Sequence, residues 1–173
     1  MKTAPEIYAD IMAHQIKGLM VHSQLADYYM LAGLTKYAKC HEKHYKKESK
    51  AWRDTSKYYI EHFNRLVPEI PIDNPDVIPK EWYGATRQEV DTNTKRKAVE
   101  RGLAIWVDWE TDTKILYQKS YTALMELGEI AAALNLQKSI CDVDSELAEA
   151  QRYHLNKKST GYDISYIVSE QDD

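Results

Sequence analysis

The sequence predicts an all-α protein: a bundle of four helices with a long crossover between the second and third helices and a short C-terminal segment. Three observations favour this fold class. Helix breakers are scarce, with six Gly and five Pro in 173 residues. Four of the five prolines lie between positions 68 and 79. On both sides of that segment apolar residues recur every three or four positions, which is typical of amphipathic helices.

Composition narrows the classes of function. A chain of 173 residues is long enough for one domain, expected over 1–173. The formal net charge of −4 provides no basic field, so nucleic-acid binding is not expected. No run of 18 apolar residues occurs and no apolar signal segment opens the chain, so we expect a cytoplasmic protein without a membrane span. The sequence shows neither a phosphate-binding glycine loop nor a nucleophile–His–acid pattern.

The first helix is expected over about 5–32, with Pro5 in its first turn. The break at 33–35 is short enough only for a reversal, so the second helix should run antiparallel to the first. The inward line of the first helix contains two polar side chains among apolar ones: Tyr8, Ile11, Gln15, Gly18, His22, Leu25, Tyr29 and Ala32.

The second helix is expected over about 36–66 and carries two neighbouring inward lines. The first is an apolar heptad line of Ala38, Tyr45, Trp52, Tyr59 and Leu66. The second is Tyr37, His41, His44, Glu48, Ala51, Thr55, Tyr58 and His62. Most Lys and Arg residues fall on other faces. His44 and Glu48 are therefore expected beside the buried face, where a carboxylate is costly unless it has a partner.

The crossover is expected over about 67–93, because its four prolines forbid a regular helix. A helix of about 31 residues spans roughly 46 Å. About 19 extended residues reach roughly 60 Å, so the crossover can travel the length of the second helix. It should deliver the third helix parallel to the second.

The third helix begins either at Thr86, where Thr86 and Glu89 form a capping-box pattern, or near Thr94, and it ends at about residue 127. One carboxylate stands in the middle of its inward line. That line is Leu103, Trp106, Glu110, Thr113, Tyr117, Ser120, Leu124 and Leu127.

Gly128 marks a tight reversal, and the fourth helix follows over about 129–158. Its inward line again has an acidic residue near the midpoint. The expected line is Ile130, Ala133, Gln137, Ile140, Asp144, Leu147, Gln151 and Leu155.

Five side chains from the four helices are therefore expected at one depth of the bundle. They are Glu48, Glu110, Asp144, His44 and His22. Inward carboxylate and imidazole ligands hold di-iron or di-manganese centres in bundles of this kind, so the sequence predicts an iron or manganese site. A polar seam in which each acid pairs with a neighbouring side chain, without a metal, is the alternative.

The run LTKYAKCHEKHYKKESKAW resembles the second helix of ferritins, in which a Leu, a Phe/Tyr-Ala-Lys and a later Glu recur. The resemblance places Glu48 on the ligand glutamate of that helix and Glu110 on the glutamate of the third helix. Asp144 then falls near the Glu or Gln of the fourth. The resemblance implies a ferritin-like protein with a dimetal centre that oxidises or stores metal, and ferroxidase-like activity is left open.

The sequence departs from the ferritin pattern at two ligand positions, and its crossover is longer than that of a typical ferritin. Ferritins carry a His three residues after the second-helix Glu, whereas Ala51 follows Glu48 at that spacing. The first-helix glutamate is replaced by Ile16 or its neighbours Gln15 and His14. His44, one turn before Glu48, can supply the missing imidazole from the same helix face.

A metal-free ferritin-like bundle that acts as a structural or interaction module is therefore the second functional hypothesis. For both hypotheses the resemblance implies self-association as a homodimer or larger assembly through the first two helices. The aromatic line of Tyr45, Trp52 and Tyr59 is the expected contact.

Overall fold

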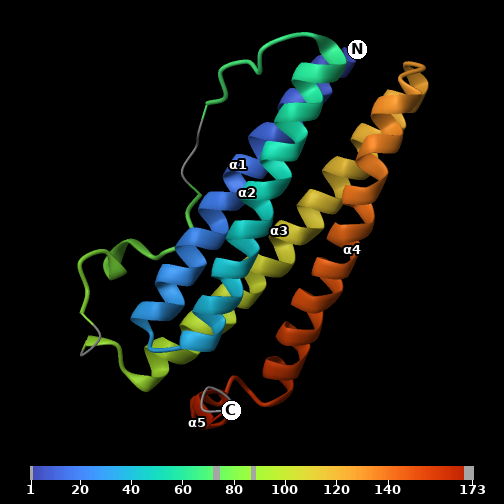
Figure 1. Cartoon of the computed structure of the whole chain (residues 1–173). Helices are drawn as coiled ribbons and strands as arrows, with labels where there is room; N and C mark the ends of the chain where they lie inside the picture. Colours follow the sequence, from blue (N-terminus) through green and yellow to red (C-terminus); the bar gives the residue numbers. More distant parts are fainter. Residues whose placement is uncertain (1, 72–74, 87–88, 170–173) are drawn as a thin grey trace.

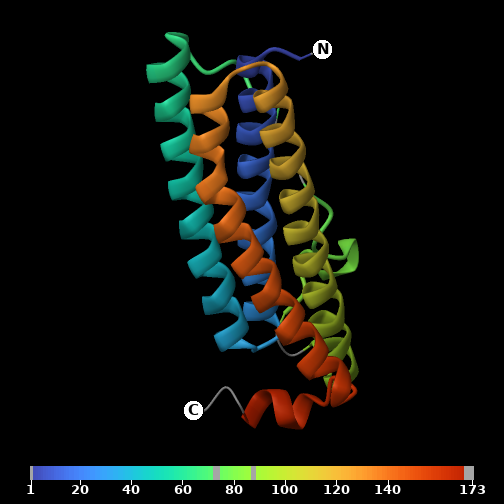
Figure 2. The ribbon, with the colours of Figure 1, turned by 90° about the vertical axis from the view of Figure 1, so that its right-hand side faces the viewer.

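The computed structural model describes residues 2–71, 75–86 and 89–169, and within these ranges it contains helices and no strand (Figure 1). Four long helices form the bundle, and the all-α fold class predicted from the sequence is confirmed. A short fifth helix lies across one end (Figure 2). The helices are α1 (Ala4–Leu31), α2 (Thr35–Phe63), α3 (Thr92–Glu126), α4 (Ile130–Ser159) and α5 (Ile164–Ser169).

Local sequence signals set the ends of the helices. α1 begins with a capping box in which the Thr3 N–H donates to Glu6 Oε2 at 2.7 Å. The two hairpin turns each place a glycine in the left-handed region, Gly33 at φ 75° and Gly128 at φ 76°. α3 begins at Thr92, where the Asp91 carboxylate accepts a bond from the N–H of Thr94 at 2.7 Å.

The start of α3 therefore agrees with the second of the two expected positions. The capping box at Thr86 does form, since the Thr86 N–H donates to Glu89 Oε2 at 2.6 Å. It caps only a local turn before the long helix, because the chain between Glu89 and Asp91 is not α-helical.

The crossover from α2 to α3 includes one 3-10 turn, η1 (Lys80–Trp82), and runs back along the bundle (Figure 1). It is fixed by burial of Trp82, whose ring lies 4.4 Å from that of Tyr28. The Arg101 guanidinium of α3 also donates to the Val77 carbonyl at 3.1 Å. α3 consequently runs parallel to α2, as the reach of the chain predicts.

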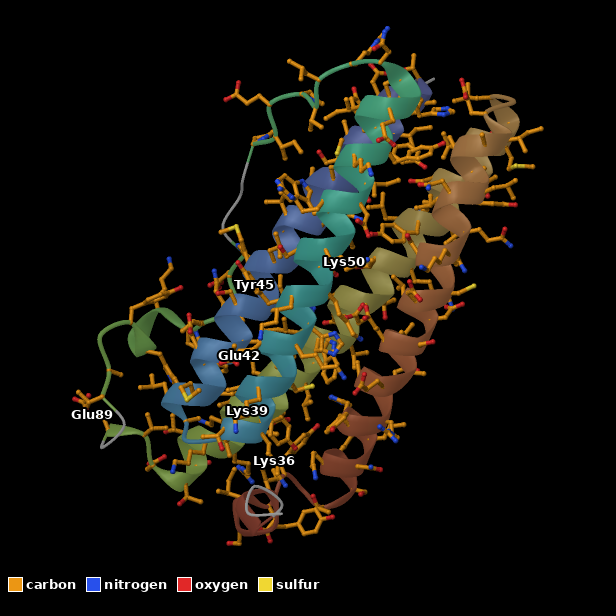
Figure 3. The ribbon with its side chains drawn as sticks, viewed as in Figure 1. Lys36, Lys39, Glu42, Tyr45, Lys50 and Glu89 are labelled. Carbon is orange, nitrogen blue, oxygen red and sulfur yellow. The ribbon has the colours of Figure 1, made fainter. Side chains whose placement is uncertain are left out.

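The inward lines of α1 and α3 are buried as predicted, apart from Leu127 at the end of the α3 line. On α2 the lysines and Glu42 labelled in Figure 3 lie on the exposed face, but Tyr45 is also 41% exposed and Leu66 lies beyond the helix. The heptad line of α2 is therefore only partly a core line.

The predicted inward line of α4 is wrong over most of its length. Ile130 is 56% exposed, Leu155 is 64% exposed, and Asp144 is exposed as well. The buried apolar positions are Ala132, Ala133, Leu136, Val143, Leu147 and Ala150. A shift of one residue turns a helix face by about 100°. The buried side of α4 consists largely of small alanines, so the larger apolar residues on the exposed side dominated the apolar periodicity of the sequence.

The apolar core is divided into two clusters, one toward each end of the bundle. One cluster contains Leu25, Tyr29 and Leu103, and the other contains Ile11, Tyr59 and Leu124. Buried polar residues from the middle of α1, α2 and α3 lie between them. This polar layer is the candidate functional site.

Candidate metal centre

Five ionisable side chains of the polar layer are buried, and they come from three helices. They are His22 from α1, His41, His44 and Glu48 from α2, and Glu110 from α3. A buried charge without a counter-charge is strongly unfavourable, and buried polar groups normally have hydrogen-bond partners. A layer of this kind therefore needs either internal pairing or a bound ion.

His22 lies at the centre of the layer. Its Nδ1 is 3.1 Å from Nδ1 of His41, a hydrogen bond in which one of the two rings donates. Its Nε2 is 3.7 Å from Oε1 of Glu110, which accepts a hydrogen bond from Trp106 Nε1 at 3.0 Å. Within the described part of the chain, His22 Nε2 and Glu110 Oε2 have no hydrogen-bond partner.

His44 completes a group of three donors with His22 and Glu110. One ligand atom from each of these side chains lies within 4.8 Å of the other two. The His44 ring stacks on that of His22 at 5.1 Å and meets the edge of Trp106 at 5.0 Å. Two imidazoles and one carboxylate form a donor set that suits iron and manganese, and the unpartnered His22 Nε2 and Glu110 Oε2 are available to a cation.

Glu48 lies close to α1, at Gly18. A Cβ added to Gly18 would lie 3.2 Å from the Glu48 carboxyl carbon and 2.9 Å from Trp109 Cζ2. Gly18 is thus the α1 residue beside Glu48. Glu48 and Trp109 fill the space that a side chain at position 18 would occupy.

The α1 residues expected in the glutamate region have other partners. Gln15 Nε2 donates to Thr55 Oγ1 and to the Tyr117 hydroxyl, both at 3.0 Å. His14 Nε2 is hydrogen-bonded to Thr113 Oγ1 at 2.7 Å, and its ring stacks on Trp109. These bonds fix the orientation of α1 against α2 and α3.

α4 contributes Glu146 to the layer instead of Asp144. The Asp144 side chain is 48% exposed and pairs with Lys114 at 2.7 Å, so the expectation that it points into the core is corrected. The Glu146 side chain is 15% exposed, accepts a bond from Lys47 Nζ at 2.9 Å, and lies 3.9 Å from His44 Nδ1. The sequence did not indicate Glu146 because the predicted inward face of α4 is shifted by one residue from the true one. The face that contains Val143, Leu147 and Ala150 also contains Glu146.

Burial changes the protonation of this layer. It raises the pKa of Glu48 to about 8, and the nearby Glu146 carboxylate adds to the rise. Burial, Glu146 and Glu48 likewise raise the pKa of Glu110 to about 8. Burial also lowers the pKa of His44 to about 4 and that of His22 well below its ordinary value. At neutral pH the imidazoles are neutral, the form that binds a metal, and a cation would favour the ionised carboxylates.

A cleft of about 590 Å³ separates the middle of α2 from α4 and reaches this layer. Glu48 and the largely buried Tyr117 lie on its inner side, and Lys47, Glu146 and Glu149 line it nearer to solvent. The cleft gives small solutes and ions a path from solvent to Glu48.

No protein-family model matches the sequence, and no curated protein matches it. Solved structures do. An open-pore ferritin from the hyperthermophilic archaeon Archaeoglobus fulgidus superposes with a TM-score of 0.77 at 12% identity, over 99% of this chain and 95% of that one. The fold is ferritin-like.

Two further structures agree with the ferritin-like fold. An engineered closed form of the Archaeoglobus fulgidus ferritin gives a TM-score of 0.76 at 13% identity, over 99% of this chain and 94% of that one. The bacterioferritin of Rhodobacter capsulatus, described with a metal-free dinuclear site and haem iron, gives 0.70 at 17% identity, over 92% of this chain and 89% of that one. The TM-scores show the fold, and identities this low show nothing about the chemistry of the site.

Proposed function

We propose that this ferritin-like chain binds iron or manganese in the middle of its bundle and takes part in metal oxidation or storage. The observation that carries the proposal is the buried group His22, His44 and Glu110, with its donor atoms within 4.8 Å of one another. The unpartnered Nε2 of His22 and Oε2 of Glu110, among the residues described, fit a bound cation better than a self-contained polar seam.

His22, His44 and Glu110 would hold one ion. Glu48 and Glu146 are not part of this group of donors, but each acts electrostatically on the pKa of Glu110. Bound iron would supply one-electron redox chemistry, and carboxylate ligands would favour its oxidised state.

Other residues of the chain position these ligands. His41 holds His22 Nδ1 through the 3.1 Å hydrogen bond, which leaves Nε2 facing Glu110. Trp106 fixes Oε1 of Glu110 by donation from its indole N–H. The apolar clusters above and below exclude water, and the cleft between α2 and α4 is the path by which an ion reaches Glu48.

A second candidate function is a metal-free ferritin-like bundle that serves as a structural or interaction module. Two positions favour it: Gly18 offers no ligand beside Glu48, and Ala51 stands three residues after Glu48.

We expect self-association under both candidate functions. On α2 the exposed aromatic residue is Tyr45, whereas Tyr59 is buried and cannot form a contact between copies. No described helix is long and apolar enough to cross a membrane.

Elemental analysis of protein purified without added metal, followed by anaerobic Fe(II) titration, separates the two candidates. The metal proposal predicts one or two ions bound per chain. Protein that stays metal-free after loading with Fe(II) and with Mn(II) would overturn it. Light scattering with and without chelator then tests self-association, and a strictly monomeric protein would contradict that part.

A further inference from the structure

A second group of potential metal ligands lies on the α2–α4 side of His44. Cys40 of α2, His44 and Glu149 of α4 each offer one donor atom, and these atoms lie within 4.8 Å of one another. His44 Nε2 is 3.9 Å from Oε2 of Glu149. Cys40 is partly buried and the Glu149 side chain is 33% exposed, so this group is nearer to solvent than the inner one.

The three donor atoms lie within 4.8 Å of one another, which is close to the spacing around a small tetrahedral ion. Zn²⁺ binds imidazole nitrogen at about 2.0 Å and thiolate sulfur at about 2.3 Å, which separates neighbouring ligand atoms by about 3.3–3.8 Å. The 3.9 Å between His44 and Glu149 needs only a small adjustment of the side chains. Thiolate, imidazole and carboxylate with one open position form a donor set that zinc uses.

We propose that Cys40, His44 and Glu149 form a second site, for a thiophilic divalent ion such as Zn²⁺, and that this outer site competes with the inner one for His44. The outer site depends only on its own residues, whereas the competition rests on the proposed function. The inner group of His22, His44 and Glu110 and the outer group share no residue other than His44.

The competition follows from the chemistry of imidazole. A neutral imidazole carries a proton on one ring nitrogen and a free lone pair on the other, so it binds one metal ion at a time. His44 stacks on the inner ligand His22 and also faces the outer ligand Glu149. An ion held by Cys40 and Glu149 therefore withdraws His44 from Glu110.

The outer site is accessible and can neutralise an ion. Glu149 lines the cleft between α2 and α4, so an ion in the cleft meets Glu149 before it reaches Glu48. Burial raises the pKa of the Cys40 thiol to about 11, so the ion must displace its proton on binding. The resulting thiolate and the Glu149 carboxylate together balance two positive charges.

Co²⁺ titration of chelator-treated full-length protein tests the outer site, because a thiolate ligand to Co²⁺ gives a charge-transfer absorption band. We expect the band in the wild type and its loss in Cys40→Ser and Cys40→Ala, with the helical circular dichroism unchanged. Cys141→Ser is the matched control, since Cys141 is an exposed thiol on α4, and it should keep the band. Glu149→Gln should weaken Co²⁺ binding by about tenfold or more.

Glu110→Gln separates this proposal from the proposed function. It should retain the Co²⁺–thiolate band even if the inner site binds nothing. No band in the wild type, or a band that survives in Cys40→Ser, would overturn the outer site.

Excess Mn²⁺ tests the competition for His44. It should raise the Co²⁺ concentration that gives half of the thiolate band in the wild type, and should do so much less in Glu110→Gln, which lacks the carboxylate of the inner site. An equal shift in both proteins, or no shift in either, would overturn the competition.

Discussion

His22 Nε2 of α1 lies 3.7 Å from Glu110 Oε1 of α3, a buried pair that is too far apart for a hydrogen bond. Among the described residues, His22 Nε2 and the second carboxyl oxygen of Glu110 have no hydrogen-bond partner. Glu110 Oε1 accepts a hydrogen bond from Trp106, so each of the two side chains is left with one buried atom that lacks a partner, and buried polar atoms usually have one. An ion between them resolves the conflict, and His44 is placed to complete its ligands.

Metal binding should raise the free energy of unfolding. Mn²⁺ at about 100 times its dissociation constant should stabilise the wild type by about 2.7 kcal/mol, because it binds the folded state alone. Urea unfolding with and without Mn²⁺ measures the change. Mg²⁺ is the control and should have little effect, since imidazole ligands do not suit it. Equal stabilisation by Mg²⁺ would point to the surface acids instead.

Trp106→Phe should weaken metal binding by about 10- to 100-fold while the helical content stays unchanged. The change removes the indole N–H that holds Glu110 Oε1 at 3.0 Å and keeps an aromatic ring in the core. Isothermal titration with Mn²⁺ measures the effect. Trp52→Phe on α2 is the matched control, because Trp52 packs with the other apolar cluster. Similar losses in both variants would mean that general packing matters, and not the hydrogen bond.

Gly18→Ala should destabilise the protein by about 1–3 kcal/mol, because the new Cβ would meet Trp109 at 2.9 Å and the Glu48 carboxyl at 3.2 Å. In an open helix the same change stabilises by up to about 1 kcal/mol, so the sign of the effect is diagnostic. Urea unfolding of the metal-free protein measures it. A more stable variant would show that α1 has room for a side chain beside Glu48.

His14 should make the wild type sensitive to acid. Burial, with the nearby Lys17, lowers the pKa of His14 to about 4, whereas an unfolded histidine titrates near about 6.5. The unfolded state therefore takes up a proton first. The stability contributed by neutral His14 is complete above about pH 6.5 and is lost as the pH falls toward 4.

His14→Phe keeps a ring against Trp109 and removes this titration. Over that pH range the wild type should lose up to about 1.4 kcal/mol per pH unit relative to the variant. Urea unfolding at pH 7, 6 and 5 gives the comparison. If the difference in free energy of unfolding between the two proteins stays constant with pH, the lowered pKa of His14 is contradicted.

The sequence predicts α1 and α3 well because their inward lines mix large apolar residues with few polar ones, and the crossover because prolines exclude helix. α4 is different. Its buried side is built from alanines, while Ile130 and Leu155 face solvent, so apolar periodicity favours the wrong face. Asp144 and Glu146 are both acidic and only two positions apart, and nothing but the true helix face distinguishes them.

Two features of the site depend on how the helices pack against one another. The His22–His41 hydrogen bond joins α1 to α2, and the distance from Glu110 to His22 is set by how α3 packs on α1. The spacing of residues within one helix carries no information on either. The sequence could place His22, His44 and Glu110 on inward faces, but not show that their donor atoms converge.

Anaerobic isothermal titration of Mn²⁺ and Fe(II) into wild type, Glu110→Gln and Asp144→Asn tests the inner metal site most directly. Both variants replace a carboxylate by an amide of the same shape, one in the core of α3 and one on the surface of α4. We predict that Glu110→Gln weakens binding by at least about tenfold and that Asp144→Asn binds like the wild type. Unchanged binding in Glu110→Gln, or a loss confined to Asp144→Asn, would contradict a metal centre at His22, His44 and Glu110.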